Sequence, residues 1–179
     1  IRKTDVSEDI EKKYLSLFQY MTTIVDDIPA GCGGVIFTPW LHGNRCPFED
    51  PNARGMFFNI SLETGKSQMI RAVLEGVTYS LYDGLLVLKE MNISPETMLL
   101  CGGGAKSPVW CQLQADITGL PVVIPTEKEA ACLGCAIIGA VADGVFPSYQ
   151  DAADKIISFQ HRYEPINHAK YEKKYEKYC

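Results

Sequence analysis

The chain has 179 residues with 17 Lys and Arg against 22 Asp and Glu, which gives a formal net charge of −5. This balance disfavours a general nucleic-acid binder, because such proteins cluster basic residues to neutralise phosphates. No apolar run reaches the roughly eighteen residues that a transmembrane helix requires, and no apolar signal segment opens the sequence. We therefore expect a cytoplasmic protein with neither a nucleic-acid nor a membrane partner.

The chain begins at Ile1 and has no initiator Met, so we expect it to be part of a longer protein. Its seven cysteines are odd in number and most lie in apolar runs, which is typical of reduced thiols. Cys132 and Cys135 form a C-x-x-C pair, but no second pair completes a zinc site. The surrounding small residues predict a buried helix in which both thiols pack against a sheet without metal.

Apolar positions with helical spacing predict a first helix from Ser7 to Ile28, followed by Pro29 and Gly31. A short buried strand is expected at residues 35–37. Residues 39–55 are rich in Pro, Gly, Asn and Asp, and they predict a long loop of the kind that is commonly functional.

A short strand near residues 56–60 and a long helix over residues 66–91 follow this loop. Gly76 and Gly84 interrupt the helix at a cost of roughly 1 kcal/mol each relative to Ala. We interpret both glycines as positions of close packing.

The second half of the chain alternates strands and helices, which predicts an α/β layer structure. The expected elements are a strand at 98–101, a helix at 107–118, a strand at 122–124 and a helix at 130–143. Beyond residue 146 the pattern weakens to a short helix at 150–157 and a charged helix at 168–178, which carries Tyr171, Tyr175 and Tyr178.

The most informative segment follows the strand at 98–101, where three consecutive glycines lead into a helix. Ser107 is a typical N-cap and Pro108 a typical first helical residue. Glycines let a ligand approach the backbone, and a helix N-terminus with free N–H groups favours phosphate. We therefore predict that this segment binds a nucleotide through Gly102, Gly103, Gly104, Ala105, Lys106 and Ser107.

Alternatives to this interpretation remain. The glycines could form a simple tight turn, and Lys106 could be an exposed loop lysine. The segment is neither a Walker loop nor a G-x-G-x-x-G dinucleotide motif.

Several blocks resemble one family. Residues 102–110 read Gly-Gly-Gly-Ala-Lys-Ser-Pro-Val-Trp, and with the block at 113–122 they are very similar to the adenosine-side loop of the FGGY carbohydrate kinases. Within this family, the run at 102–110 is most similar to the xylulose kinases. Residues 55–60 and 68–76 resemble the family's second signature, with Asn59 where the family has Gly. Asn is the residue that best replaces Gly at a positive φ.

Two shorter blocks agree with this resemblance. Residues 41–47 are similar to the family's Gly-Glu-Arg-Thr-Pro loop, with Asn44 and Cys46 as departures. Residues 129–136 are similar to its Glu-Ala-x-x-Leu-Gly-Ala-Ala helix. Together the blocks span roughly Gly34 to Pro147.

The resemblance implies a ribonuclease-H-like domain of the actin, hexokinase and Hsp70 superfamily, with a mixed sheet flanked by helices. It implies that ATP and Mg²⁺ bind between this domain and an N-terminal kinase domain. The γ-phosphoryl group would pass to a hydroxyl of a small sugar, a ketose such as D-xylulose. Gluconate, ribulose, fuculose or glycerol kinases of the family, and a stand-alone nucleotide-binding domain without kinase activity, are the alternatives.

The family's catalytic Asp lies upstream of the block at 41–47, and Asp26 and Asp27 do not match its context. We therefore expect no catalytic residue and no metal ligand here, and a fragment that is inactive alone. The chain should form one domain over residues 1–179, with a leading helix at 1–32, a core at 33–147 and a C-terminal helical tail at 148–179. Its expected protein partners are the N-terminal kinase domain and a second copy in a homodimer.

Overall fold

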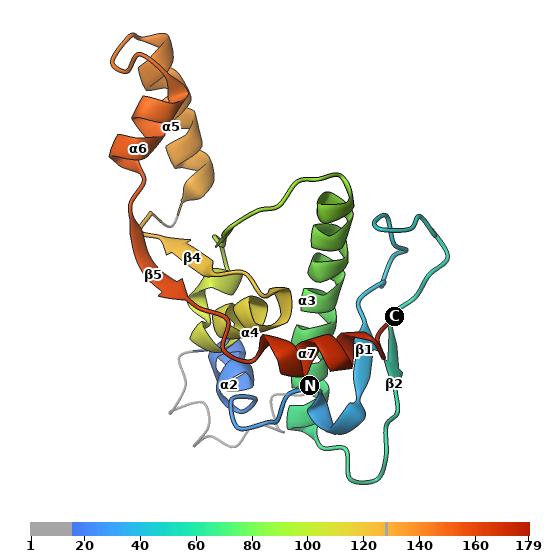
Figure 1. Cartoon of the computed structure of the whole chain (residues 1–179). Helices are drawn as coiled ribbons and strands as arrows, with labels where there is room; N and C mark the ends of the chain where they lie inside the picture. The colour runs from blue at the N-terminus through green and yellow to red at the C-terminus, as the bar shows by residue number, and fades with distance from the viewer. Residues whose placement is uncertain (1–15, 128) are drawn as a thin grey trace.

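The computed structural model describes residues 16–127 and 129–179 and has an α/β architecture with two small sheets (Figure 1). Strand β1 (Ile36–Thr38) pairs antiparallel with β2 (Met56–Phe58). In the other sheet, β3 (Met98–Leu99) runs parallel to β4 (Val122–Pro125), and β4 pairs antiparallel with β5 (Phe159–Tyr163). The expected mixed sheet is confirmed, and the pair β1–β2 forms a second sheet apart from it.

Helix α4 lies at the centre of the packing. The α-helices are α2 (Leu17–Thr23), α3 (Lys66–Glu90), α4 (Pro108–Thr118), α5 (Ala130–Ala142), α6 (Tyr149–Ile156) and α7 (His168–Tyr175). One side of α4 packs Cys111 and Ala115 against Val122 of β4. Its other side packs Leu113 and Ile117 against α3 and α7. The central helix is therefore clamped between the mixed sheet and two helices.

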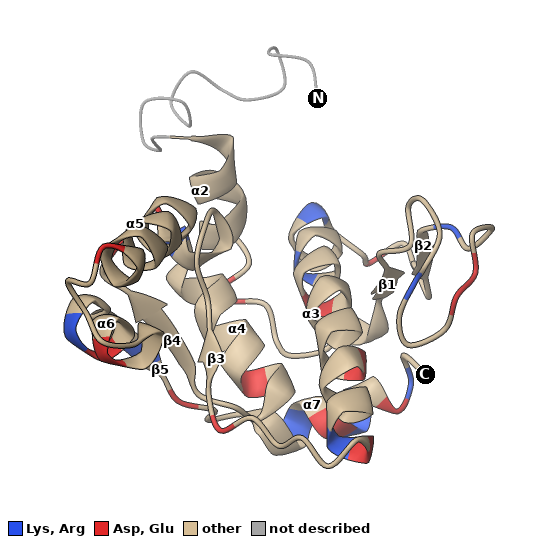
Figure 2. Ribbon diagram, turned by 90° about the horizontal axis from the view of Figure 1, so that it is seen from above, with Lys and Arg blue, Asp and Glu red and all other residues tan. Residues whose placement is uncertain are grey.

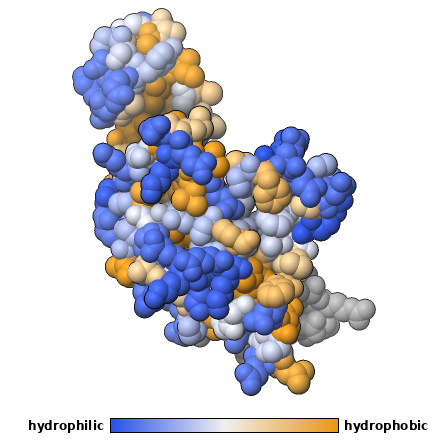
Figure 3. All heavy atoms as spheres, turned by 45° about the vertical axis from the view of Figure 1, so that its right-hand side comes forward, coloured by the Kyte–Doolittle hydropathy of each residue, from blue (hydrophilic) through white to orange (hydrophobic). Residues whose placement is uncertain are grey.

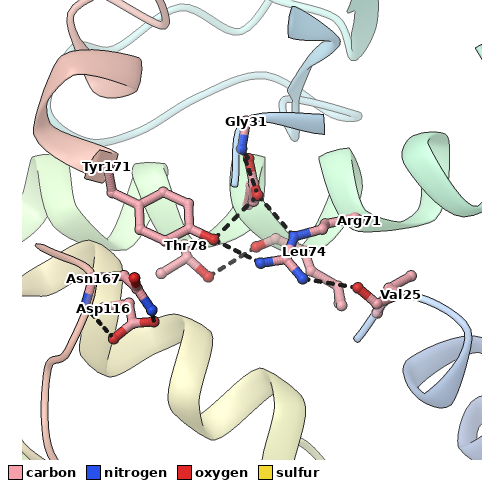
Figure 4. Close-up of polar contacts among 9 residues, drawn as sticks. Val25, Gly31, Arg71, Leu74, Thr78, Asp116, Asn167 and Tyr171 are labelled. Carbon is pink, nitrogen blue, oxygen red and sulfur yellow. Dashed lines mark hydrogen bonds and ion pairs between the residues drawn. The ribbon is translucent and has the colours of Figure 1, made fainter. Parts of the chain in front are cut away.

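A buried carboxylate joins three segments of this core (Figure 4). Glu75 of α3 is only 2% exposed and accepts hydrogen bonds from the Gly31 N–H at 3.1 Å and from Arg71 Nε at 3.0 Å. The Tyr171 hydroxyl of α7 also lies 3.3 Å from it, and Arg71 donates in turn to Tyr171 and to the Val25 carbonyl. The network fixes α7 and the segment 25–31 on α3.

The first and last parts of the chain differ from the sequence-based expectation. Within the described residues the first helix ends at Thr23 rather than Ile28, and the residues that follow form turns. Residues 7–15 of that predicted helix lie outside the described residues. The predicted helical tail also contains β5, whose polar sequence carries no strand signal, and it places the buried Tyr171 in the core.

Helices α5 and α6 form a pair that projects from the rest of the molecule (Figure 1). The prediction that Cys132 and Cys135 are buried is wrong, because α5 packs on α6 and both thiols are exposed. The large apolar side chain of Ile138, at 57% exposure, also remains uncovered on α5. Figure 3 shows apolar surface along one side of the projecting pair.

Thiol accessibility should follow the structure. Five cysteines are exposed, whereas Cys32 and Cys111 are buried. Burial also raises the pKa of the Cys111 thiol to about 11, which suppresses the reactive thiolate. We expect a thiol reagent at pH 8 to label five sites rapidly and the two buried ones only after unfolding, as mass spectrometry can show. Slow labelling of Cys132 and Cys135 would show that α5 is covered in this chain.

The two glycines of α3 have different surroundings. A Cβ built on Gly76 would lie 2.0 Å from the Phe37 carbonyl oxygen, so the helix backbone packs directly on β1 and close packing is confirmed there. A Cβ on Gly84 would meet no atom within 4 Å, so the expectation of close packing at Gly84 is wrong. Asn59 adopts a φ of 62°, as its replacement of a glycine suggests, and its side chain donates to the Gly34 carbonyl.

Gly76→Ala should lower the free energy of unfolding by about 2 kcal/mol or more, since the methyl group forces α3 off β1. The matched variant Gly84→Ala should raise it by about 0.5–1 kcal/mol, since Ala favours helix and nothing opposes its methyl group. Urea unfolding followed by circular dichroism measures both. Equal effects of the two substitutions would contradict the packing at Gly76.

No described helix is both long and apolar enough to cross a membrane.

Candidate functional site

The three glycines after β3 form an open loop. Gly102 has a φ of 78°, which favours glycine, while Gly103 has helical angles (φ −63°, ψ −38°) and leads into a 3₁₀ turn at Gly104–Lys106. A Cβ built on Gly102 or Gly103 would meet no heavy atom within 4 Å. The glycines therefore leave room for a ligand beside the backbone and are not required by tight packing.

Backbone donors are concentrated in this loop. Within the described part of the chain, no hydrogen bond takes up the N–H groups of Gly102, Gly103, Gly104 or Ala105. Helix α4 begins directly behind them, with Ser107 as its N-cap and Pro108 at its first position. Free N–H groups and the positive end of a helix dipole together favour an anion.

The far side of the loop is anchored to the core. The Cys111 thiol donates to the carbonyls of Gly104 and Ala105 at 3.8 and 3.7 Å, and its raised pKa keeps it protonated for this role. The Trp110 N–H donates to the Ser107 hydroxyl at 3.2 Å, and the Trp110 indole donates to Thr78 of α3 at 3.4 Å. Sequence reasoning missed Thr78 as a support, because only the fold brings α3 beside the loop.

The six predicted site residues form one continuous surface. Gly102, Gly103 and Lys106 are exposed, while Gly104, Ala105 and Ser107 are half-buried. The Lys106 side chain has no hydrogen-bond or ion-pair partner among the described residues, so both sequence interpretations of it stay open. The simple tight turn explains neither the open space nor the unused donors.

The long loop after β1 lies on the other side of α3 from the glycine loop in both ribbon views (Figures 1 and 2). Backbone hydrogen bonds between Asn44 and Asp50 join the two sides of this loop. The Trp40 ring packs edge-on against Phe48 at 5.2 Å, and the buried Trp40 N–H has no partner among the described residues. The structure therefore separates the two loops that the sequence singled out.

Carboxylates are not gathered beside the glycine loop. In residues 16–127 and 129–179, no group of three or more His, Cys, Asp or Glu side chains could hold a metal ion. Asp26 and Asp27 are exposed in the turns that follow α2. The described site therefore offers backbone donors for an anion but no set of acidic side chains.

Known proteins place this geometry in context. The C-terminal domain of the FGGY family of carbohydrate kinases matches residues 7–142. The gluconokinase of Bacillus subtilis is 38% identical over 170 residues, which cover 93% of this chain and 33% of that protein.

Solved structures agree with the sequence match. The ligand-bound xylulose kinase of Lactobacillus acidophilus superposes with a TM-score of 0.81 at 30% identity, over 90% of this chain and 33% of that one. The Plasmodium falciparum glycerol kinase with ADP superposes with a TM-score of 0.78 over 97% of this chain and 35% of that one. At 20% identity the last likeness shows the fold alone. The chain spans about a third of the length of these relatives.

Proposed function

This chain belongs to the FGGY family of carbohydrate kinases, and from that premise we propose that it is the ATP-binding part of a sugar kinase. The unused backbone donors of residues 102–105 at the start of α4 are the observation that carries the proposal. They suit the phosphates of a nucleotide, and the open space beside Gly102 and Gly103 leaves room for it. The γ-phosphoryl group would pass to a hydroxyl of a small sugar substrate.

Phosphoryl transfer depends mostly on positioning and on neutralising charge, so the role of this chain is to hold and orient the nucleotide. Mg²⁺ usually keeps several waters and binds through one or two carboxylates together with substrate phosphates. Since the described residues gather no acidic cluster, Mg²⁺ would be held mainly by the nucleotide and by the N-terminal kinase domain. That domain would also supply the carboxylate that removes the proton from the sugar hydroxyl.

Two substrates have support for this proposal. The run at residues 102–110 favours a ketose such as D-xylulose, and a xylulose kinase is among the structural relatives. Gluconate is the second candidate, because a gluconokinase is 38% identical. An assay of both substrates with the full-length protein distinguishes them.

The projecting helix α5 gives the N-terminal domain a surface to contact. Its Ala, Gly and Cys residues are small and apolar, and Cys132, Cys135 and Ile138 are exposed. An exposed apolar surface of this kind is unfavourable in water and typically marks an interface. We therefore place the contact with the rest of the kinase on α5.

Nucleotide binding can be tested with Gly103→Val. Gly103 has helical angles and a Cβ there would meet no heavy atom within 4 Å, so the fold should tolerate valine while the ligand loses access to the backbone. We expect the 179-residue chain to bind ATP with a dissociation constant on the order of millimolar (about −4 kcal/mol), because the second wall of the cleft is missing. The variant should weaken binding by about tenfold or more, as measured by NMR titration.

Gly84→Val is the matched control, since Gly84 is also helical and open but lies in α3 outside the loop. It should leave the ATP affinity unchanged. Equal affinity of the wild type and a folded Gly103→Val variant would rule out the glycine loop as the nucleotide site.

The isolated chain should not phosphorylate sugar, because no residue of its sequence matches the family's catalytic Asp and the cleft needs a second wall. A coupled ADP-release assay with D-xylulose or gluconate should give no turnover above the control without sugar. Adding the N-terminal part of the kinase should restore turnover if the two parts associate. Steady turnover by the chain alone would show that the base lies within it.

A further inference from the structure

A basic hollow lies beside α7, away from the glycine loop. Its volume is about 630 Å³, and it is lined by residues 28–30, by Arg71 of α3 and by one side of α7. The floor includes Tyr171, which is 1% exposed, and Arg71, whose side chain is 11% exposed. The volume falls within the range of roughly 300–1,000 Å³ that is typical of small-molecule sites.

Four lysines of one helical face line this hollow. Lys170, Lys173, Lys174 and Lys177 stand at positions i, i+3, i+4 and i+7 of α7 and the turn after it. The acidic residues of this helix, Glu172 and Glu176, do not line the hollow. Figure 2 shows this mixture of basic and acidic positions along α7 beside α3.

The like charges are not neutralised within the hollow. Asp116 is its one lining carboxylate, and its oxygens accept from Gln112, from the N–H groups of Ile166 and Asn167, and from the Asn167 amide. Among the described residues no lysine of the hollow forms an ion pair. Like charges at i and i+4 oppose helix formation. Within residues 16–127 and 129–179, four lysines without an ion-pair partner are therefore concentrated at one concave place, although the whole chain has a net charge of −5.

Two contacts hold the cationic groups in position. The Lys174 side chain lies over Gly31, where a Cβ would stand only 2.8 Å from its Cδ. Arg71 donates three of its five N–H groups, to Glu75, Val25 and Tyr171, so two have no described partner. A rigid guanidinium at the floor and lysines around the rim match a ligand with several negative charges.

We propose that this hollow binds a small phosphorylated molecule carrying at least two closely spaced phosphate groups, at a site separate from the glycine loop. Lysines near a helix C-terminus are favourable on their own through the helix dipole. That effect does not account for the hollow, for the arginine at its floor or for the placement of the acidic residues outside it. The proposal does not depend on the kinase assignment.

The test titrates the 179-residue chain with inorganic pyrophosphate. Binding is measured from amide chemical shifts in NMR and by calorimetry. Pyrophosphate should shift the amides of Ala30 and Gly31 equally in the wild type and in Gly103→Val, because binding in the hollow does not require the glycine loop. Malonate, which carries two closely spaced carboxylates, should bind more weakly. The double variant Lys173→Gln/Lys177→Gln should weaken pyrophosphate binding by about tenfold, because it removes two charge-assisted contacts.

The control Lys89→Gln/Lys155→Gln makes the same change in net charge outside the hollow and should alter the affinity by less than about twofold, because distant exposed charges are screened. An equal loss in both double variants would show general charge attraction and overturn the site. Absence of binding to the wild type, shifts confined to the glycine loop, or malonate binding as tight as that of pyrophosphate would each overturn the proposal. Separate ATP titration of Gly103→Val tests the nucleotide site independently of this result.

Discussion

The buried carboxylate of Glu75 is the constraint on which the arrangement of this chain depends. A charge in the interior is unfavourable unless it is paired and hydrogen-bonded, so Glu75 requires donors from outside its own helix. The N–H of Gly31 and the hydroxyl of Tyr171 meet that requirement beside Arg71, and they thereby fix α7 on α3. Helix α4 packs between these helices and the mixed sheet, and its N-terminus carries the glycine loop. The candidate site is therefore positioned by a polar network that it does not touch.

Local signals in the sequence were sufficient to locate the glycine loop and the start of α4. Consecutive glycines, a serine cap and a first-turn proline identified the loop and the start of α4, because each acts through the backbone of its own segment. Strand β5 could not be predicted, since Phe159–Tyr163 is almost entirely exposed and is ordered by pairing with β4. The place of Tyr171 in the core depends on Glu75, which lies 96 residues away, and no local pattern conveys such a contact.

Composition alone also gave the wrong prediction for the burial of α5. Small apolar residues predict burial, yet Cys132 and Cys135 are exposed because no part of the described chain covers them. The same reasoning succeeded at Gly76, where the partner surface of β1 lies within the chain. The cases of α5 and Gly76 show that an apolar sequence pattern indicates a surface that must be covered. Only the structure shows whether the covering surface lies within the same chain.

The long sequence separation of the Glu75 network has a consequence for protein synthesis. Gly31 and Arg71 leave the ribosome well before Tyr171, yet the hydroxyl of Tyr171 is one of the donors to the buried carboxylate. Contacts of such high contact order form slowly, and intermediates that await them expose apolar surface. Until α7 has emerged, the nascent domain would hold an incompletely satisfied charge between α3 and the segment 25–31. Chaperone binding during translation should therefore persist until α7 docks.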